Sequence, residues 1–208
     1  IMFMLAVALL LSLKAASAAK TVFVTEVQTG SATSASEEFV EIYNSGLADI
    51  DISGWSMYYK SATGTTWTKK ATVVSGEIKA KDFWVFSANL PGNTSYSSGL
   101  SGTGGNIQIR DKAGVIIDQF GWGNANASLG SPASASGGGQ SMYRLYSFDS
   151  GFFQNTDNNF SDFDIADITS PVNLPAVEVP MKGVQSICLK AFRLILNLIF
   201  QYRLRTAK

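Results

Sequence analysis

Between residues 21 and 163 the chain consists of short stretches in which apolar and polar residues alternate, separated by glycine, serine, asparagine and aspartate. Successive side chains of a β-strand point to opposite faces, so a period of two is typical of strands with one buried face. The stretches cover residues 21–28, 38–44, 55–59, 65–69, 83–86, 107–110, 115–118 and 141–146, and a last one starts near residue 162. This pattern predicts an all-β protein, a sandwich or barrel of eight or nine strands.

Two turns are predicted with particular clarity. Residues 38–44 (EFVEIYN) form a strand with Val40 and Ile42 on one face, and residues 51–55 (DISGW) then form a turn that places Trp55 at the start of the next strand. Residues 111–114 (DKAG) separate two alternating segments, and glycine can adopt the positive φ that closes such a hairpin. We therefore expect neighbouring antiparallel strands on both sides of residues 111–114.

The first 19 residues read as a secretory signal peptide. An apolar run at residues 2–13 is followed by small residues, with cleavage expected after Ala18. The run is short for a membrane span but suits a signal sequence; the alternative is a buried strand or helix. We expect the mature protein to be secreted or associated with the cell envelope, with a domain at residues 20–170 and a proline-containing linker at residues 171–183.

The last segment, residues 184–208, predicts an amphipathic helix. Its polar residues recur every three or four positions, which gives a polar stripe on an otherwise apolar helix. Lys190, Arg193, Arg203 and Arg205 would let this helix lie on an anionic membrane surface. Packing against a partner protein, or an artefact at the end of the gene, are the alternatives for this tail.

Charge and composition restrict the function. Residues 20–175 contain nine lysines and arginines against fifteen aspartates and glutamates, a net charge of −6, whereas residues 176–208 carry +5. An acidic domain disfavours nucleic acid as a partner unless one face is locally basic. The chain has no histidine and its one cysteine, Cys188, lies in the tail, which excludes Ser-His-Asp and Cys-His catalytic arrangements and most zinc sites.

The order of these motifs resembles the lamin-tail domain. The matching residues are Glu26, 38–44, 51–55, Gly104 and Gly105, 111–114, Asp118, Trp122, 141–144, 157–159, Asp162 and Phe163. Phe39 replaces the usual tryptophan, and the glycine of the usual exit motif is absent from residues 171–175. The resemblance implies an immunoglobulin-like β-sandwich and, in prokaryotes, an extracellular adhesion or tethering module.

Four polar residues are candidates for a partly buried cluster. We expect Glu26, Glu38 and Asn44 on the core side of their strands, at its edge, where they could meet Arg144. The interpretation we favour is a structural polar cluster, and a cation site or a catalytic site are the alternatives. Glu38 and Glu41 are three residues apart on a strand and face opposite sides, so these strands offer no carboxylate pair to a hydrolytic site.

Residues 155–164 are rich in aspartate and asparagine. Oxygen ligands from Asp157, Asn159, Asp162 and Asp164 would suit Ca²⁺, although the spacing is not that of an EF-hand. The alternative is a set of Asx turns at a strand entry. No other cofactor is expected.

Aromatic residues at positions 58, 59, 67, 84, 122 and 143 are assigned to the core, with stacking on sugar rings or nucleobases as the alternative. Taken together, the sequence predicts an exported, non-enzymatic binding or tethering module. Its expected partners are a cell-surface protein or polysaccharide, and a membrane surface through the tail. A nucleic-acid-binding module and a carboxylate-dependent hydrolase of polysaccharide or nucleic acid are the alternative functions.

Overall fold

The computed structural model describes residues 20–167. The predicted signal peptide, the linker and the tail with Lys190, Arg193, Arg203 and Arg205 lie outside the described residues. The strands of four or more residues are β1 (Val22–Gln28), β2 (Glu38–Asn44), β4 (Ser56–Ser61), β5 (Thr68–Thr72), β7 (Phe83–Ala88), β9 (Gly104–Arg110), β10 (Ile116–Gly123), β11 (Ser141–Arg144) and β14 (Phe163–Ala166). Two-residue strands are β3 (Ile50–Asp51), β6 (Glu77–Ile78), β8 (Thr94–Ser95), β12 (Tyr146–Ser147) and β13 (Phe152–Phe153), and α1 (Asn159–Asp162) is a single helical turn.

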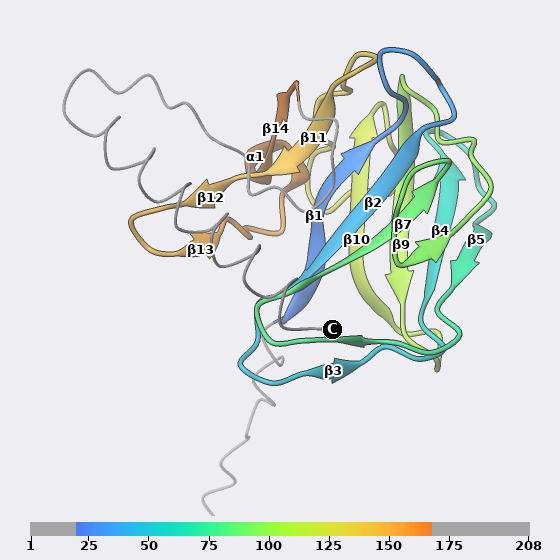
Figure 1. Ribbon diagram of the computed structural model, residues 1–208. Coiled ribbons are helices and arrows are strands. Elements are labelled where there is room, and N and C mark those ends of the chain that lie inside the picture. Colours follow the sequence, from blue (N-terminus) through green and yellow to red (C-terminus); the bar gives the residue numbers. More distant parts are fainter. Residues whose placement is uncertain (1–19, 168–208) are drawn as a thin grey trace, which may run out of the picture. The chain divides into compact units, whose positions relative to one another are not determined.

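The longer strands form two sheets. One has the order β14-β11-β1-β2-β7-β8 and the other the order β10-β9-β4-β5 (Figure 1). All pairings are antiparallel except that of β7 with β8. The small pairs β3-β6 and β12-β13 lie outside the two large sheets. This arrangement confirms the predicted immunoglobulin-like β-sandwich.

The predicted strands match the longer observed ones closely, with one displacement. The strand expected at residues 65–69 is found at Thr68–Thr72, which leaves Trp67 just before it. A β-bulge at Lys70 of β5, opposite Met57 and Tyr58, shifts the register of β5 against β4. Alternation in the sequence cannot reveal a bulge, because a bulge adds a residue to only one of the two paired strands.

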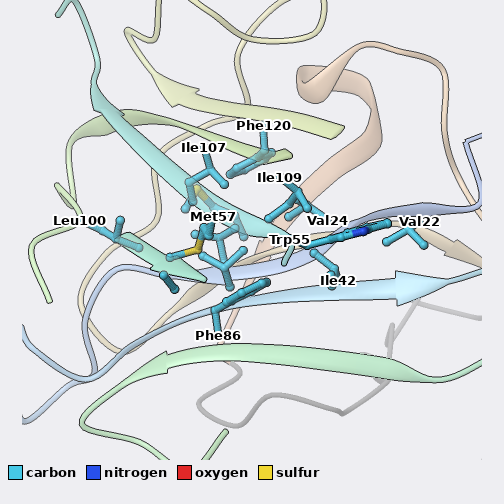
Figure 2. Packing of buried hydrophobic residues seen from close by; sticks show 14 of the residues in the cluster. Val22, Val24, Ile42, Trp55, Met57, Phe86, Leu100, Ile107, Ile109 and Phe120 are labelled. Atoms are coloured by element: carbon cyan, nitrogen blue, oxygen red, sulfur yellow. The ribbon is translucent and has the colours of Figure 1, made fainter. Parts of the chain in front are cut away.

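The core lies between the two sheets and draws on both of them. Val40 and Ile42 of β2 pack in one cluster with Met57 of β4, Ile109 of β9 and Phe120 of β10, and all five are fully buried. Figure 2 shows side chains of this cluster converging from strands of both sheets. Full burial of one such side chain stabilises the fold by roughly 1.5–3 kcal/mol. The two sheets are therefore held together mainly by apolar contact.

Residues 51–55 form the predicted turn. The Asp51 carboxylate accepts a hydrogen bond from the Ser53 N–H at 2.9 Å, and Gly54 has φ +82°. A side chain at Gly54 would be strained at that φ, and its Cβ would lie 3.0 Å from Cβ of Lys112. The turn delivers Trp55 into the core with 9% of its surface exposed.

Candidate functional site

The predicted calcium ligands are placed on one short segment, but their oxygens have separate partners. The Asp162 carboxylate accepts hydrogen bonds from N–H and Oγ1 of Thr156, and Asn159 Oδ1 accepts from the N–H groups of Gly121 and Leu129. Asp157 pairs with Lys20, and Asp164 accepts from the N–H of the next residue. Among residues 20–167 no three Asp, Glu, His or Cys side chains are placed to hold a metal ion together. The geometry is that of local turns and strand entry.

Arg144 occupies a buried charge cluster instead of the predicted one with Glu26 and Glu38. Its guanidinium Nη1 lies 3.2 Å from Asp162 Oδ2 and its Nη2 lies 3.7 Å from Asp118 Oδ2, and all three side chains are at most 1% exposed. Arg144 Nε also donates to the Val24 carbonyl. Burial raises the pKa of Asp118 and lowers the pKa of Arg144, and the attraction between the two charges opposes both shifts.

This cluster of Arg144, Asp118 and Asp162 joins elements distant in the sequence. Asp118 Oδ2 accepts from the Val24 N–H at 2.8 Å, so β10 of one sheet is tied to β1 of the other. Asp162 links the same guanidinium to the turn α1. A fully buried charge cluster whose members pair with one another and with the backbone suits a structural role. The prediction of a structural role for Arg144 fits this geometry, with different partners.

Glu38 and Asn44 lie on the core-side face of β2, as expected, but at opposite ends of the strand. The Glu38 carboxylate accepts hydrogen bonds from the N–H groups of Gly99 and Leu100. Burial raises its pKa, and these two hydrogen bonds counteract the shift. Asn44 Nδ2 donates to three carbonyl groups, those of Ala48, Ile78 and Lys79. Each residue thus satisfies the backbone of a nearby loop.

Glu26 lies on the other face of its sheet, which corrects the prediction. A β-bulge between Val24 and Glu26 shifts the register, so Glu26 is paired directly opposite Glu41 on β2. Directly opposed residues share a face, and the neighbouring Val40 and Ile42 point into the core. The prediction that these strands hold no carboxylate pair on one face is therefore wrong.

The pair Glu26 and Glu41 is buried and supported by hydroxyl groups. The two residues are 1% and 2% exposed. Ser141 Oγ donates to Glu26 at 2.6 Å and Thr25 Oγ1 donates to Glu41 at 2.7 Å. Burial, with a contribution from the nearby Glu41 charge, raises the pKa of Glu26 to about 9. Glu26 is therefore protonated at neutral pH, and its burial leaves little room for a substrate.

The outer surface of the sheet β10-β9-β4-β5 carries a second kind of site. Five of its residues, Tyr58, Lys60, Trp67, Lys69 and Arg110, are here called the cationic–aromatic face. Tyr58 and Arg110 follow the core residues Met57 and Ile109, so they point away from the core. Cζ of Arg110 lies 4.1 Å from the ring centroid of Tyr58, and Nζ of Lys60 lies 5.1 Å from that of Trp67.

The assignment of aromatic residues to the core holds for only part of the set. Trp122 is fully buried, and Tyr59 and Trp84 pack against the core cluster. Tyr58 and Trp67 instead lie half-buried on the outer face beneath lysine and arginine. Tyr143 is buried on the face of its sheet that carries Glu26. Because successive side chains of a strand point to opposite faces, the burial of Met57 in the core already indicates that its neighbour Tyr58 points away from the core.

A shallow recess lies at one end of the sandwich. Its volume is about 410 Å³, and it is lined by Thr29, Gly30, Ser31, Ala32, Thr33, Ser34, Ala35, Leu100, Gly102, Ser136 and Gly138. None of these lining residues is titratable. The recess therefore lacks the acid and base groups on which most hydrolases depend.

Comparison with protein families identifies the domain. The family described as Lamin Tail Domain matches residues 15–124, just over half of the chain. The chain therefore belongs to the lamin tail domain family, whose immunoglobulin-like fold is non-catalytic. Sheet pairing continues past the matched region, because β11 and β14 extend the sheet that contains β1. No curated protein matches the chain, and within residues 20–167 no helix is long and apolar enough to cross a membrane.

Proposed function

We propose that this chain is an exported, non-catalytic binding module that tethers the protein at the cell surface or envelope. The main support for this proposal is the distribution of the charged groups. The buried acids and Arg144 are engaged in internal hydrogen bonds and ion pairs, whereas Lys69 and Arg110 lie on an open sheet face. A surface of this kind supports binding rather than bond cleavage.

The family supports the same proposal. Immunoglobulin-like domains provide rigid sheets on which binding surfaces are built, and fold alone does not specify the ligand. Export rests on the apolar run at residues 2–13 and the small residues after it. Retention at the envelope rests on the basic, apolar segment 184–208, with a cell-surface protein or polysaccharide as the partner of the domain.

The hydrolase alternative has one observation in its favour, the paired carboxyl groups of Glu26 and Glu41. Paired carboxylates with one raised pKa are used by glycosidases. Both residues are almost fully buried, however, and each accepts a hydrogen bond from a neighbouring hydroxyl group. A structural role for the pair is therefore the better interpretation.

The test is cell fractionation of the full-length protein beside a chain that ends at Pro175. We expect the full-length protein in the envelope fraction and the shorter chain in the medium, because the shorter chain lacks the basic segment. Equal release of both into the medium would contradict retention through the tail. Retention of both in the cytoplasm would contradict export.

A further inference from the structure

The cations of the cationic–aromatic face form no ion pair within the described residues. The ion pairs found within residues 20–167 all involve Lys20, Lys79 or Arg144. In that part of the chain no carboxylate lies within 4 Å of Lys69 or Arg110. Lys70, Lys81 and Lys112 also lack an ion pair in residues 20–167. Lys60, Lys69 and Arg110 stand out because they gather beside two aromatic rings on one sheet face, in a domain whose net charge is −6. Charge complementarity therefore favours an anionic ligand.

The rings on this face are held in place by those cations. The Arg110 guanidinium lies between Tyr58 and Trp67, 4.1 Å and 5.7 Å from the two ring centroids, and Nζ of Lys69 lies 5.7 Å from the centroid of Tyr58. Cation–π contacts of this kind contribute about 0.5–1 kcal/mol at exposed sites. The aromatic groups are thus pre-organised, which lowers the entropic cost of binding.

A row of amide groups orients the guanidinium. Gln108 Oε1 accepts a hydrogen bond from Arg110 Nε at 2.9 Å and a second one from Nη2. Gln108 Nε2 in turn donates to Gln119 Oε1 on β10. Within the described residues Nη1 of Arg110 makes no hydrogen bond, so it remains able to donate to a ligand carboxylate.

We propose that this face binds an acidic polysaccharide, a chain of carboxylated sugar rings. This proposal specifies the ligand class of the binding module and rests on the binding function proposed above. The parts of Tyr58 and Trp67 that the cations leave exposed offer apolar surface to the faces of sugar rings, and the sugar carboxylates pair with Lys69 and Arg110. The face extends over the three strands β9, β4 and β5, roughly 10 Å at the usual strand spacing, and none of its residues lines the recess at the end of the sandwich. An extended polymer suits it better than a small molecule.

Nucleic acid fits this face less well. Binding to a nucleic-acid backbone commonly neutralises six or more phosphates, about one for each lysine or arginine in contact. The cationic–aromatic face has three cations, of which Lys60 is only 7% exposed and donates to Asn126. A polysaccharide with one carboxylate per sugar ring has a lower charge density than nucleic acid. Its widely spaced charges suit cations that are separated by aromatic rings.

The test measures the affinity of the full chain for polygalacturonate at low salt by affinity electrophoresis. The variant K69Q/R110Q is compared with the control K79Q/K81Q, which loses the same charge elsewhere. The tail is identical in both. We expect at least tenfold weaker binding for K69Q/R110Q, at least fivefold weaker binding for the charge-neutral variant W67A, and less than a twofold change for the control.

Four further outcomes would overturn the proposal. Equal binding by the wild type and K69Q/R110Q would assign polygalacturonate binding to the tail. Polyacrylate bound as tightly as polygalacturonate would show that ring contacts are not used. If a single-stranded DNA oligonucleotide binds more tightly than polygalacturonate, and K69Q/R110Q abolishes that binding, the face binds nucleic acid. Envelope retention without polygalacturonate binding would leave the tethering function intact and refute only this ligand class.

Discussion

Buried asparagine side chains close several loops of this sandwich. Asn44, Asn106 and Asn159 are all fully buried. Asn106 Nδ2 donates to the carbonyl groups of residues 60, 61 and 62, and its Oδ1 accepts from the Ala127 N–H. Loops lack the regular partners of a sheet, so their buried backbone groups need side-chain partners. Side-chain amides meet this need because they both donate and accept.

Among single residues, Glu26 carries the clearest consequence for pH. Its pKa in the folded protein is about 9, compared with an ordinary value of 4.5. The folded state therefore keeps a proton that the unfolded chain releases. The associated stabilisation is fully present below about pH 4.5 and is lost as the pH rises towards 9, with a slope of up to about 1.4 kcal/mol per pH unit.

We predict that Glu26→Gln makes the free energy of unfolding less dependent on pH between 5 and 9, because glutamine stays neutral and can still accept from Ser141. The measurement is urea unfolding at pH 5, 7 and 9. The control is Glu77→Gln, which changes a carboxyl group whose side chain is 46% exposed. Equal pH dependence in the wild type and Glu26→Gln would show that Glu26 is already ionised in the folded state.

At the level of elements, bulges decide which side chains share a face. The bulge in β1 places Glu26 opposite Glu41, and the bulge at Lys70 in β5 places Lys69 opposite Tyr58 of β4. Each bulge adds one residue to a strand and reverses the alternation beyond it. The buried carboxyl pair depends on the first bulge, and the pairing of Tyr58 with Lys69 depends on the second.

The segment around α1 yields a second prediction. Asp162, Asn159 and Asp157 have protein partners in the structure, so binding of calcium would first have to break these contacts. We expect a 100-fold excess of Ca²⁺ over protein to leave the melting temperature unchanged within about 1 °C. Differential scanning fluorimetry with Ca²⁺, and with Mg²⁺ as the control, measures this. A rise with Ca²⁺ alone would instead support the predicted calcium site.

For the whole molecule, the shared core makes the two sheets one folding unit. Phe120 of β10 contacts Phe163 of β14 with ring centroids 4.4 Å apart, and so joins the two sheets directly. Apolar contacts between sheets favour a cooperative transition in a domain of this size. Loss of a large side chain at this position should therefore weaken both sheets together.

We predict that Phe120→Ala lowers the free energy of unfolding by about 3–5 kcal/mol. The matched control, Phe152→Ala, removes a ring that is 61% exposed and should cost less than about 1 kcal/mol. Urea unfolding is followed by tryptophan fluorescence and by circular dichroism. Separate transitions in the two signals would indicate that the sheets unfold independently.

Local sequence patterns were enough to predict most of the strands, the two turns and the family. Alternation at residues 38–44 and the DISGW turn are local patterns, because strand periodicity and turn chemistry act over a few neighbouring residues. The core residues Val40, Ile42 and Met57 follow from the same alternation. These features needed no knowledge of which strands are neighbours.

The partners of the polar residues depend on the tertiary structure and could not be predicted. Arg144 pairs with Asp118 and Asp162 rather than with Glu26, because one bulge turned Glu26 to the opposite face. The cationic–aromatic face likewise required β4, β5 and β9 to be adjacent. Register and bulges depend on contacts between strands far apart in the chain, and a local sequence pattern does not contain that information.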